Sequence, residues 1–165
     1  MIAIKWGRAG RITGDVTYLK SAGRWRYLAV VMDRHSRRVL GWNLGLRRDL
    51  NLTLGALNRV QKARRATNLI FHSDRGVEFS AYAFRTRLAG FGITQSMKRS
   101  REITDNAFIE SFFHSMKSDV IHGLAFDNDR DLQRVVSRYF RRYNRTRLHS
   151  SIGYRSPIDY ENVAA

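Results

Sequence analysis

The chain has 165 residues, a length typical of one domain with a substantial buried core. Hydrophobic residues make up 43% and aromatic residues 12% of the sequence, which excludes a disordered polycation. Thirty Lys and Arg against fourteen Asp and Glu give a net charge of +16, so nucleic acid is the first partner that the charge predicts. Charge alone leaves open a basic binding protein without catalysis, of the ribosomal or chromatin type.

The absence of cysteine excludes disulfides, thiol catalysis and zinc sites built on Cys, and it is consistent with a reducing cytosol. No stretch is apolar over the length that a signal peptide or a membrane span requires. We therefore expect a soluble cytoplasmic protein with no membrane contact.

Three predicted strands come first in the chain. Residues 11–19 alternate apolar and polar side chains, as a half-buried strand does. Residues 26–33 are almost continuously apolar, which indicates a central strand covered on both faces, and residues 38–45 form the third strand. The short polar links between these strands predict an antiparallel meander.

The rest of the chain alternates helices and strands and then ends in helices. Apolar residues at helical spacing mark the helices, and short β-branched runs mark the strands. A glycine ends one of the helices. The predicted ranges are a helix over 50–60, a strand over 68–74, a helix over 79–90, a strand over 91–96, and helices over 104–118 and 130–144. This order predicts an α/β fold in which a mixed sheet carries helices on both faces.

The helix predicted over residues 130–144 combines a buried stripe with a basic surface. Its apolar residues recur at i, i+3, i+4, i+7, i+8 and i+11 from Leu132, and arginines cover the remainder. A solvated helix surface is one interpretation, but in so basic a chain contact with phosphates is favoured. The basic residues are Arg134, Arg138, Arg141, Arg142 and Arg145, followed by Arg147.

Glu110 is the one acidic residue between Asp105 and Asp119, on the helix predicted over residues 104–118. It lies at the border between the apolar stripe and solvent, on a flank that it shares with other polar residues. An ordinary surface glutamate that pairs weakly with His114 is the alternative, and periodicity alone favours it.

Two other acidic residues make a functional role for this glutamate more plausible. Asp15 lies inside a predicted strand, where Asp is disfavoured, and Asp74 ends another strand, where loops of α/β sheets usually carry function. Hard cations take oxygen ligands, and phosphoryl transfer on nucleic acids commonly uses two of them. The three carboxylates therefore suggest a Mg²⁺ site, which by spacing alone is one hypothesis among several.

Three further residues compete for roles at such a site. Asp33 is a rival of Asp15, but it ends its strand where a turn begins, and a turn-forming Asp is the simpler explanation. His72 is a candidate base, yet water bound to a metal needs no such base. We therefore expect His72 to lie next to the ligands without binding the metal itself. Glu78 is expected to begin the following helix.

The chain shares six ordered segments with a known family: DVTYL, YLAVVMDRHSRRVLGW, FHSDRGVEFS, the GI and SM pairs of FGITQSMKRS, TDNAFIESFFHSMK and YFRRYNRTRLHSSIGYRSP. Over roughly residues 11–160 it resembles the catalytic core of bacterial insertion-sequence transposases of the orfB type, relatives of retroviral integrases. Thirty-five residues, 75–109, separate Asp74 from Glu110, and this spacing is typical of the Asp-Asp-Glu family.

The resemblance implies a ribonuclease-H-like fold, in which an antiparallel three-strand meander and two parallel strands form a five-stranded mixed sheet flanked by helices. It implies that Asp15 and Asp74 hold two Mg²⁺ ions, which Mn²⁺ can replace, and that Glu110 completes the second site. The implied reaction is in-line displacement at phosphorus. Water as the nucleophile nicks the strand and frees a 3′-OH, and that 3′-OH then joins strands, without ATP or a covalent enzyme intermediate.

The resemblance also implies DNA contacts. Lys117 matches the lysine that grips the transposon end, His114 is a neighbouring position, and Asn106 belongs to the motif around the glutamate. Cations before this helix suit a loop that closes on phosphates, although a solvated loop explains them equally well. The family's YN–R motif begins at Tyr143, for which we prefer aromatic packing. The predicted DNA-contacting residues are Lys98, Arg99, Arg101, Asn106, His114, Lys117, Arg141, Arg142, Arg145 and Arg147.

The sequence departs from the family pattern at three places. Gly14 stands where Thr is more frequent, which is expected to loosen the strand, and Asp119 replaces a Glu, which we expect to be tolerated. Residues 1–10 are expected to be an N-terminal extension and 11–160 the catalytic core. The helical DNA-end-binding region of the relatives would then be absent, so this would be an excised domain or a truncated element.

Double-stranded DNA, as transposon ends and as target, is the partner that the resemblance implies. Pairing of two ends implies a homo-oligomer, a dimer or a larger synaptic complex, and the upstream helix-turn-helix region is a further partner or fusion. Two alternative functions stay open: a DNA-binding remnant without turnover and a structure-specific nuclease on the same fold. All of them predict salt-sensitive DNA binding, but only the enzymes require metal and the three carboxylates. The implied location is the bacterial nucleoid.

Overall fold

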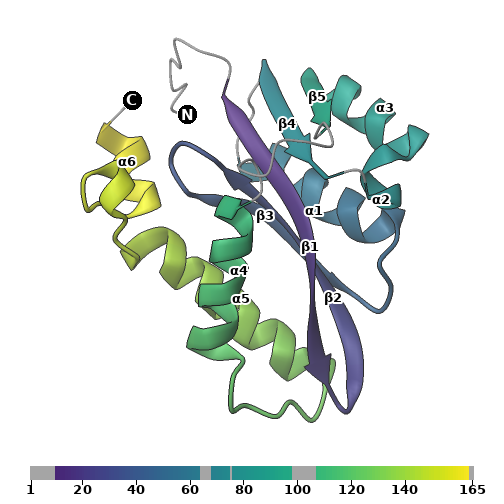
Figure 1. The fold of residues 1–165 in the computed structure, drawn as a ribbon, viewed down its shortest axis with the longest axis vertical. Helices are drawn as coiled ribbons and strands as arrows, with labels where there is room; N and C mark the ends of the chain where they lie inside the picture. The colour runs from purple at the N-terminus through teal and green to yellow at the C-terminus, as the bar shows by residue number, and fades with distance from the viewer. Residues whose placement is uncertain (1–9, 64–67, 75, 98–106, 164–165) are drawn as a thin grey trace.

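A computed structural model of the chain describes residues 10–63, 68–74, 76–97 and 107–163. Its centre is a five-stranded sheet in the order β3-β2-β1-β4-β5, with helices on both faces (Figure 1). The strands are β1 (Arg11–Ser21), β2 (Arg24–Asp33), β3 (Val39–Gly45), β4 (Leu69–Ser73) and β5 (Ile93–Met97). The helices are α1 (Leu50–Ala63), α2 (Val77–Ser80), α3 (Tyr82–Gly90), α4 (Ala107–Val120), α5 (Asp129–Thr146) and α6 (Pro157–Val163), with a 3-10 turn η2 (Ser150–Ile152).

The strand pairing confirms the predicted mixed sheet. β1, β2 and β3 form an antiparallel meander, and β4 pairs in parallel with both β1 and β5. The turn between β1 and β2 consists of Ala22 and Gly23, with φ angles of 47° and 70°. Positive φ at both central residues is the conformation whose twist matches an antiparallel hairpin, so this turn keeps β1 and β2 in register to their ends.

Apolar side chains form one cluster on each face of the sheet. Ile12 and Val16 of β1 face the layer of α1 and α3, whereas Leu19 belongs to the cluster of α4 and α5. This division follows from the strand period of two, which sends alternate residues to opposite faces. α4 and α5 each contribute an apolar stripe at helical spacing, as the sequence predicts.

One predicted helix is wrong in its extent. The predicted helix over residues 79–90 is two helices, α2 and α3, because Ala81 between them is extended, with φ −58° and ψ 137°. At the N-terminal end of the described residues, the carbonyl oxygen of Gly10 accepts a hydrogen bond from the Ile70 N–H at 2.8 Å. At the other end, α6 continues the fold to Val163.

α6 is held against the turn between β2 and β3 by a buried carboxylate. Glu161 accepts a hydrogen bond from the Ser36 hydroxyl at 2.7 Å and forms an ion pair with Arg38 at 2.5 Å. In the described part of the chain, no helix is long and apolar enough to cross a membrane.

Candidate active site

The register between β1 and β4 brings two predicted ligands to the same level of the sheet. β1 and β4 pair in parallel from Arg11↔Ile70 to Thr13↔His72. Asp15, inside β1, and Asp74, directly after β4, each come two residues beyond the last pair, so they lie at the same level of the sheet. This is the edge at which α/β sheets usually carry their functional groups.

The third predicted ligand, Glu110, lies in the first turn of α4, and its effect on Asp15 reveals their proximity. The pKa of Asp15 is raised to about 6, first of all by burial, with the charges of Asp74 and Glu110 acting in the same direction. A hydrogen bond from the Val16 N–H at 2.7 Å and the charge of Arg48 oppose this rise. The three acids therefore share one electrostatic environment, as carboxylates around a metal site do.

The three carboxylates are not drawn together into a closed cage. Among the residues that the structure describes, no three His, Asp or Glu side chains converge closely enough to hold a metal ion. Glu110 is exposed at the start of α4, and Asp74 is only partly buried. The donor set nevertheless fits a hard divalent cation, because it is all oxygen and its mutual repulsion would be relieved by positive charge.

Arg48 is a cation at this site that the sequence reasoning missed. Its Nη2 lies 3.8 Å from Oδ2 of Asp74, and its Nε donates a hydrogen bond to Oε1 of Glu78 at 2.6 Å. Burial lowers the pKa of Arg48, but the hydrogen bond and charge of Glu78 and the charges of Asp74 and Asp15 reverse this and raise it. Nothing in the local sequence distinguishes Arg48 from the other arginines, since its role depends on tertiary contact.

The segment after Asp74 requires glycine. The Gly76 N–H donates a hydrogen bond to Oδ1 of Asp74 at 2.9 Å. A Cβ at Gly76 would lie 2.9 Å from that oxygen and 2.8 Å from Oε1 of Glu78. Any side chain would thus disturb both carboxylates. Glu78 begins α2, as predicted, and is buried.

Gly14 lies in a regular part of β1, and the strand pairing shows no irregularity at the position where the sequence predicts a looser strand. It is buried and stays in register with Val31 of β2. A Cβ at Gly14 would lie 2.5 Å from Cζ of Phe71, so the phenylalanine ring fills the space that a side chain would need. The departure from Thr is therefore matched by packing against β4.

Asp33 and His72, the alternative candidates for a ligand or a base, have other contacts in the structure. Asp33 is buried and its Oδ1 accepts hydrogen bonds from the N–H groups of His35 at 2.7 Å and Ser36 at 3.0 Å, so it is the turn-forming Asp that the sequence predicts. His72 is buried on β4, two residues before Asp74, which is compatible with a place behind the ligands.

The DNA-contacting residues predicted on α4 have different degrees of exposure. His114 is exposed, whereas Lys117 is partly buried and its Nζ lies 4.5 Å from the centre of the Tyr18 ring. Burial lowers the pKa of Lys117. Four other predicted contacts lie outside the described residues: Lys98, Arg99, Arg101 and Asn106.

The arginines predicted to contact DNA on α5 and directly after it have different partners. Arg141, Arg142 and Arg145 are exposed. Arg147 instead forms an ion pair with Asp119 of α4 at 2.9 Å. Asp119 thus has a partner in the fold, and the sequence offered no sign of this pairing.

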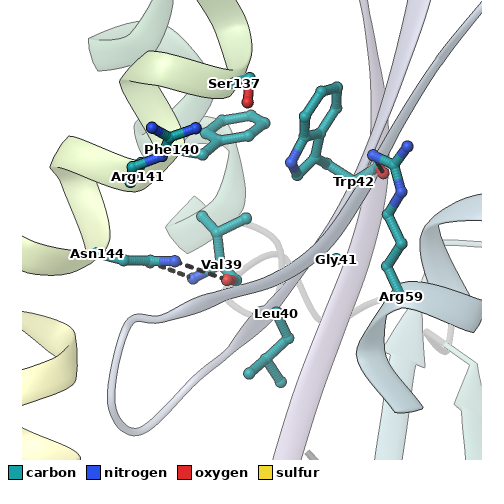
Figure 2. A pocket seen from close by; sticks show the side chains of 9 residues that line it. All are labelled: Val39, Leu40, Gly41, Trp42, Arg59, Ser137, Phe140, Arg141 and Asn144. Carbon is teal, nitrogen blue, oxygen red and sulfur yellow. Dashed lines mark hydrogen bonds between the residues drawn. The ribbon is translucent and has the colours of Figure 1, made fainter. Parts of the chain in front are cut away.

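The remaining residues of the YN–R motif are structural. Tyr143 is buried, with its ring 5.1 Å from the centre of Phe112, which confirms the predicted aromatic packing. The Asn144 amide exchanges two hydrogen bonds of 2.9 Å with the N–H and C=O of Val39 (Figure 2). Asn144 thereby occupies the free edge of β3, where another strand would otherwise pair.

A hollow of about 250 Å³ lies beside that contact, between β3, α1 and α5 (Figure 2). Trp42, Arg59 and Arg141 are among its lining residues, and the guanidinium of Arg59 lies 4.6 Å from the centre of the Trp42 ring. None of the three predicted ligands lines this hollow, because β3 is an edge strand and β2 separates it from β1.

Comparison with protein families gives two matches of the same description. One family model described as an integrase core domain matches residues 7–102, and a second of that description matches residues 91–157. Together they span the sheet and all three acids.

Two transposases are among the similar curated proteins. Transposase InsF for insertion sequence IS3A of Escherichia coli (strain K12) is 38% identical over 151 residues, which cover 90% of this chain and 52% of that protein. The transposase for insertion sequence element IS904 of Lactococcus lactis subsp. lactis (strain IL1403) is 31% identical over 150 residues, which cover 90% of this chain and 59% of that protein. The chain thus spans about half the length of the curated relatives it matches.

Solved structures of retroviral integrases share the fold. The HTLV-2 integrase catalytic core domain, solved in complex with magnesium in a trimeric form, matches with a TM-score of 0.73 at 15% identity, over 93% of this chain and 97% of that one. The catalytic core of BIV integrase matches with a TM-score of 0.71 at 18% identity, over 94% and 95%. These likenesses establish the ribonuclease-H-like fold that the sequence predicts.

Proposed function

Because the chain belongs to the integrase core domain family, which it shares with insertion-sequence transposases, we propose that it catalyses phosphoryl transfer on DNA. One observation carries the proposal: Asp15 lies level with Asp74 on adjacent parallel strands, and its pKa responds to both Asp74 and Glu110. A basic chain of net charge +16 provides the attraction for the polyanionic substrate.

Asp15, Asp74 and Glu110 would hold the divalent ions, Mg²⁺ with Mn²⁺ as a substitute. Two such ions, when bound, supply charge stabilisation for the attacking and the leaving oxygen of an in-line displacement. Backbone amides orient two of the ligands, since Val16 N–H donates to Asp15 and Gly76 N–H donates to Asp74. Both donors leave further carboxylate lone pairs available to a cation.

Arg48 neutralises part of this acidic cluster. Its guanidinium is anchored by the buried Glu78 and reaches toward Asp74 at 3.8 Å. It thereby limits the repulsion among the carboxylates, and its exposed end is available to the phosphates of a bound strand.

Two successive reactions follow from this assignment. Water attacks phosphorus, the bond from phosphorus to the 3′ oxygen breaks, and a free 3′-OH remains beside a 5′-phosphate. In the joining step that 3′-OH attacks a phosphodiester of the target, forming one new phosphodiester and releasing one 3′-OH. Each step exchanges one ester oxygen at phosphorus, so neither ATP nor a covalent enzyme intermediate is required.

We further propose that the protein acts as a homo-oligomer, because joining of two DNA ends requires two active sites. The similar HTLV-2 integrase core was solved in dimeric and trimeric forms. The DNA contacts would include Lys117 and His114 on α4 and the exposed arginines of α5. They form basic surfaces on the layer that contains Glu110.

The test is titration of Mg²⁺ and Mn²⁺ into the wild-type chain and the variants Glu110→Gln and Asp74→Asn. A labelled duplex with a pre-exposed 3′-OH reports nicking and joining. Metal-dependent products are expected from the wild type and should vanish in both variants, because each variant removes a ligand charge. DNA affinity should be unchanged or tighter, because a negative charge near phosphate is lost.

Asp127→Asn is the control, since Asp127 is an exposed acid in the link between α4 and α5. It should retain wild-type products. Equal activity of Glu110→Gln and wild type contradicts the assignment of the ligands. If the wild type binds DNA but makes no product at any metal concentration, the chain is either a core that needs further parts of the relatives for activity or a DNA-binding remnant.

A further inference from the structure

The outer half of the β1–β2 hairpin carries an exposed aromatic pair. Tyr18 of β1 is 56% exposed and Trp25 of β2 is 54% exposed. Their rings meet edge to face, with centres 5.1 Å apart and an interplanar angle of 88°. Because the two rings are in contact and both are more than half exposed, they form a contiguous aromatic patch on the surface.

The strand register explains why these side chains lie on one face. Tyr18 is paired with Tyr27, and Trp25 with Lys20, so Tyr18, Lys20 and Trp25 project to the same side of the hairpin. The other side carries Leu19, which is buried against α4 and α5. This end of the hairpin extends beyond α1, α2 and α3, which cover the rest of the aromatic side of the sheet (Figure 1).

Two lysines flank the rings. Nζ of Lys117 lies 4.5 Å from the centre of the Tyr18 ring, and Nζ of Lys20 lies 5.8 Å from the centre of the Trp25 ring. Within the described part of the chain, neither lysine forms an ion pair. Their charges are therefore available to an anion that lies against the aromatic surface.

The hairpin end is fixed in place by contacts with the segment between α4 and α5 and with the first residue of α5. The Ala22 N–H donates a hydrogen bond to the carbonyl oxygen of Phe126 at 2.7 Å. Arg26 forms an ion pair with Asp129 at 2.7 Å. A surface held in this way loses little conformational entropy when a ligand binds.

The aromatic pair lies close to the predicted ligands along both elements that carry them. Tyr18 comes three residues after Asp15 on β1, about 10 Å along a strand. Lys117 comes seven residues after Glu110 on α4, also about 10 Å along a helix. Asp15 and Tyr18 project to opposite faces of β1, and Lys117 of α4 reaches the Tyr18 ring beside the edge of β1 that β4 leaves unpaired beyond Thr13. A DNA strand with one phosphate at the carboxylates would therefore bring its next nucleotides to this surface by passing that edge.

We propose that Tyr18 and Trp25, flanked by Lys20 and Lys117, bind unpaired bases of the DNA strand adjacent to the reacting phosphate; this deepens the proposed function and rests on it. Aromatic rings stack on bases of any sequence, and neighbouring cations follow the backbone. A base inside a duplex offers no free face, so the occupant is an unpaired or frayed segment. The alternative is a cross-strand pair that only stabilises the hairpin.

The experiment compares two DNA ligands, a blunt duplex and the same duplex with an unpaired 3′ tail, by fluorescence anisotropy in EDTA. The wild-type chain is expected to bind the tailed duplex about tenfold more tightly, as stacking of one or two bases predicts. The Tyr18→Leu/Trp25→Leu double variant should lose this preference while binding the blunt duplex as the wild type does.

Two further variants separate stacking from hairpin stability. Tyr18→Phe/Trp25→Phe retains aromatic faces and should keep the preference for the tail. Tyr82→Leu removes an even more exposed aromatic ring on α3 and should change nothing. An undiminished preference in the leucine double variant, or its loss in the phenylalanine one, overturns the proposal.

The failure of this site is distinguishable from failure of the proposed function. Binding is measured without metal, so inactivity of the wild type in the nicking assay does not affect the result. If the wild type binds neither DNA ligand, both proposals are wrong. If it binds both equally tightly, only the site on the hairpin is wrong.

Discussion

Two carboxylates around the C-terminal helices are paired with arginines, whereas the acids around Asp15 repel one another. Arg147 pairs with Asp119 at 2.9 Å, and the buried Glu161 pairs with Arg38 at 2.5 Å. Around Asp15, by contrast, burial and two further carboxylates raise the pKa of this acid to about 6. The nearest approach of a cation to Asp74 within the described residues is the 3.8 Å contact of Arg48.

Under the proposed function, the difference separates residues that stabilise the fold from residues that would bind metal. A paired charge is compatible with burial because its partner offsets the loss of hydration. A crowded group of acids lowers stability, so its presence calls for a function that uses the negative charge. The same comparison assigns Asn144 to the fold, because its amide satisfies both polar groups of Val39.

Replacing Asn144 by Leu should produce the largest change in stability. Leucine leaves the N–H and the C=O of Val39 without their partners at a buried strand edge. Each unsatisfied buried group costs roughly 1–3 kcal/mol, so we expect a loss of about 2–4 kcal/mol in the free energy of unfolding. Urea denaturation followed by circular dichroism measures this loss.

Asn51→Leu is the matched control for this variant. Asn51 is exposed on α1, and its replacement should stay within about 0.5 kcal/mol of the wild type. If Asn144→Leu is as stable as Asn51→Leu, the hydrogen bonds to Val39 do not stabilise the fold. A functional role for the YN–R motif would then be favoured instead.

Replacing Asp15 by Asn should increase the free energy of unfolding, whereas the Asn144 replacement decreases it. The pKa of Asp15 is raised from 3.8 to about 6 in the folded protein, so its ionised form opposes folding at pH values above 6. At pH 8 in EDTA, removal of this charge should stabilise the protein by about 1–3 kcal/mol. The gain should decrease as pH falls through 6 and vanish below 3.8, where Asp15 is protonated in both states.

Thermal unfolding at pH 8 and at pH 3.5 checks this prediction, with Asp127→Asn as the exposed control. Asp127→Asn should leave the stability at pH 8 unchanged. A destabilised Asp15→Asn at pH 8 would mean that the carboxylate is compensated in solution, and the contrast between the two regions would not hold.

Side-chain periodicity was sufficient to predict most of the strands and helices, whereas the adjacency of β1 and β4 was implied by the family resemblance. The alternation over residues 11–19 and the apolar run over residues 26–33 depend on local side-chain order, which a strand retains in any context. Asp15 stood out from local rules because strands disfavour Asp. Its grouping with Asp74 and Glu110 as three ligands came from spacing typical of a family, and the pKa of Asp15 supports their proximity.

The sequence did not predict which carboxylate each arginine pairs with. Arg48 and Arg147 look alike in a chain with 30 basic residues, yet one faces Asp74 and the other Asp119. Each pairing joins residues that are at least 26 positions apart, so no local pattern encodes it. Likewise, the extended backbone at Ala81 divides a predicted helix although alanine favours helix.

The smallest expected effect distinguishes two arginines near the end of α5. Arg145 is exposed and, within the described residues, forms no ion pair, whereas Arg147 is paired with Asp119. If Arg145 contacts a phosphate, Arg145→Gln should lower the slope of log affinity against log salt by about 1. Arg147→Gln should leave that slope unchanged and reduce stability by at most about 1 kcal/mol, as for other exposed ion pairs.

Anisotropy titrations with a blunt duplex over a range of NaCl concentrations give both slopes. An equal decrease in the two variants would show that Arg147 exchanges Asp119 for a DNA phosphate on binding, as the family resemblance implies. In that case pairing in the free protein would not exclude a residue from the DNA interface. Arg147 would then pair with Asp119 in the free protein and contact a phosphate in the complex with DNA. The contrast with the acids around Asp15 would apply only to the unbound state.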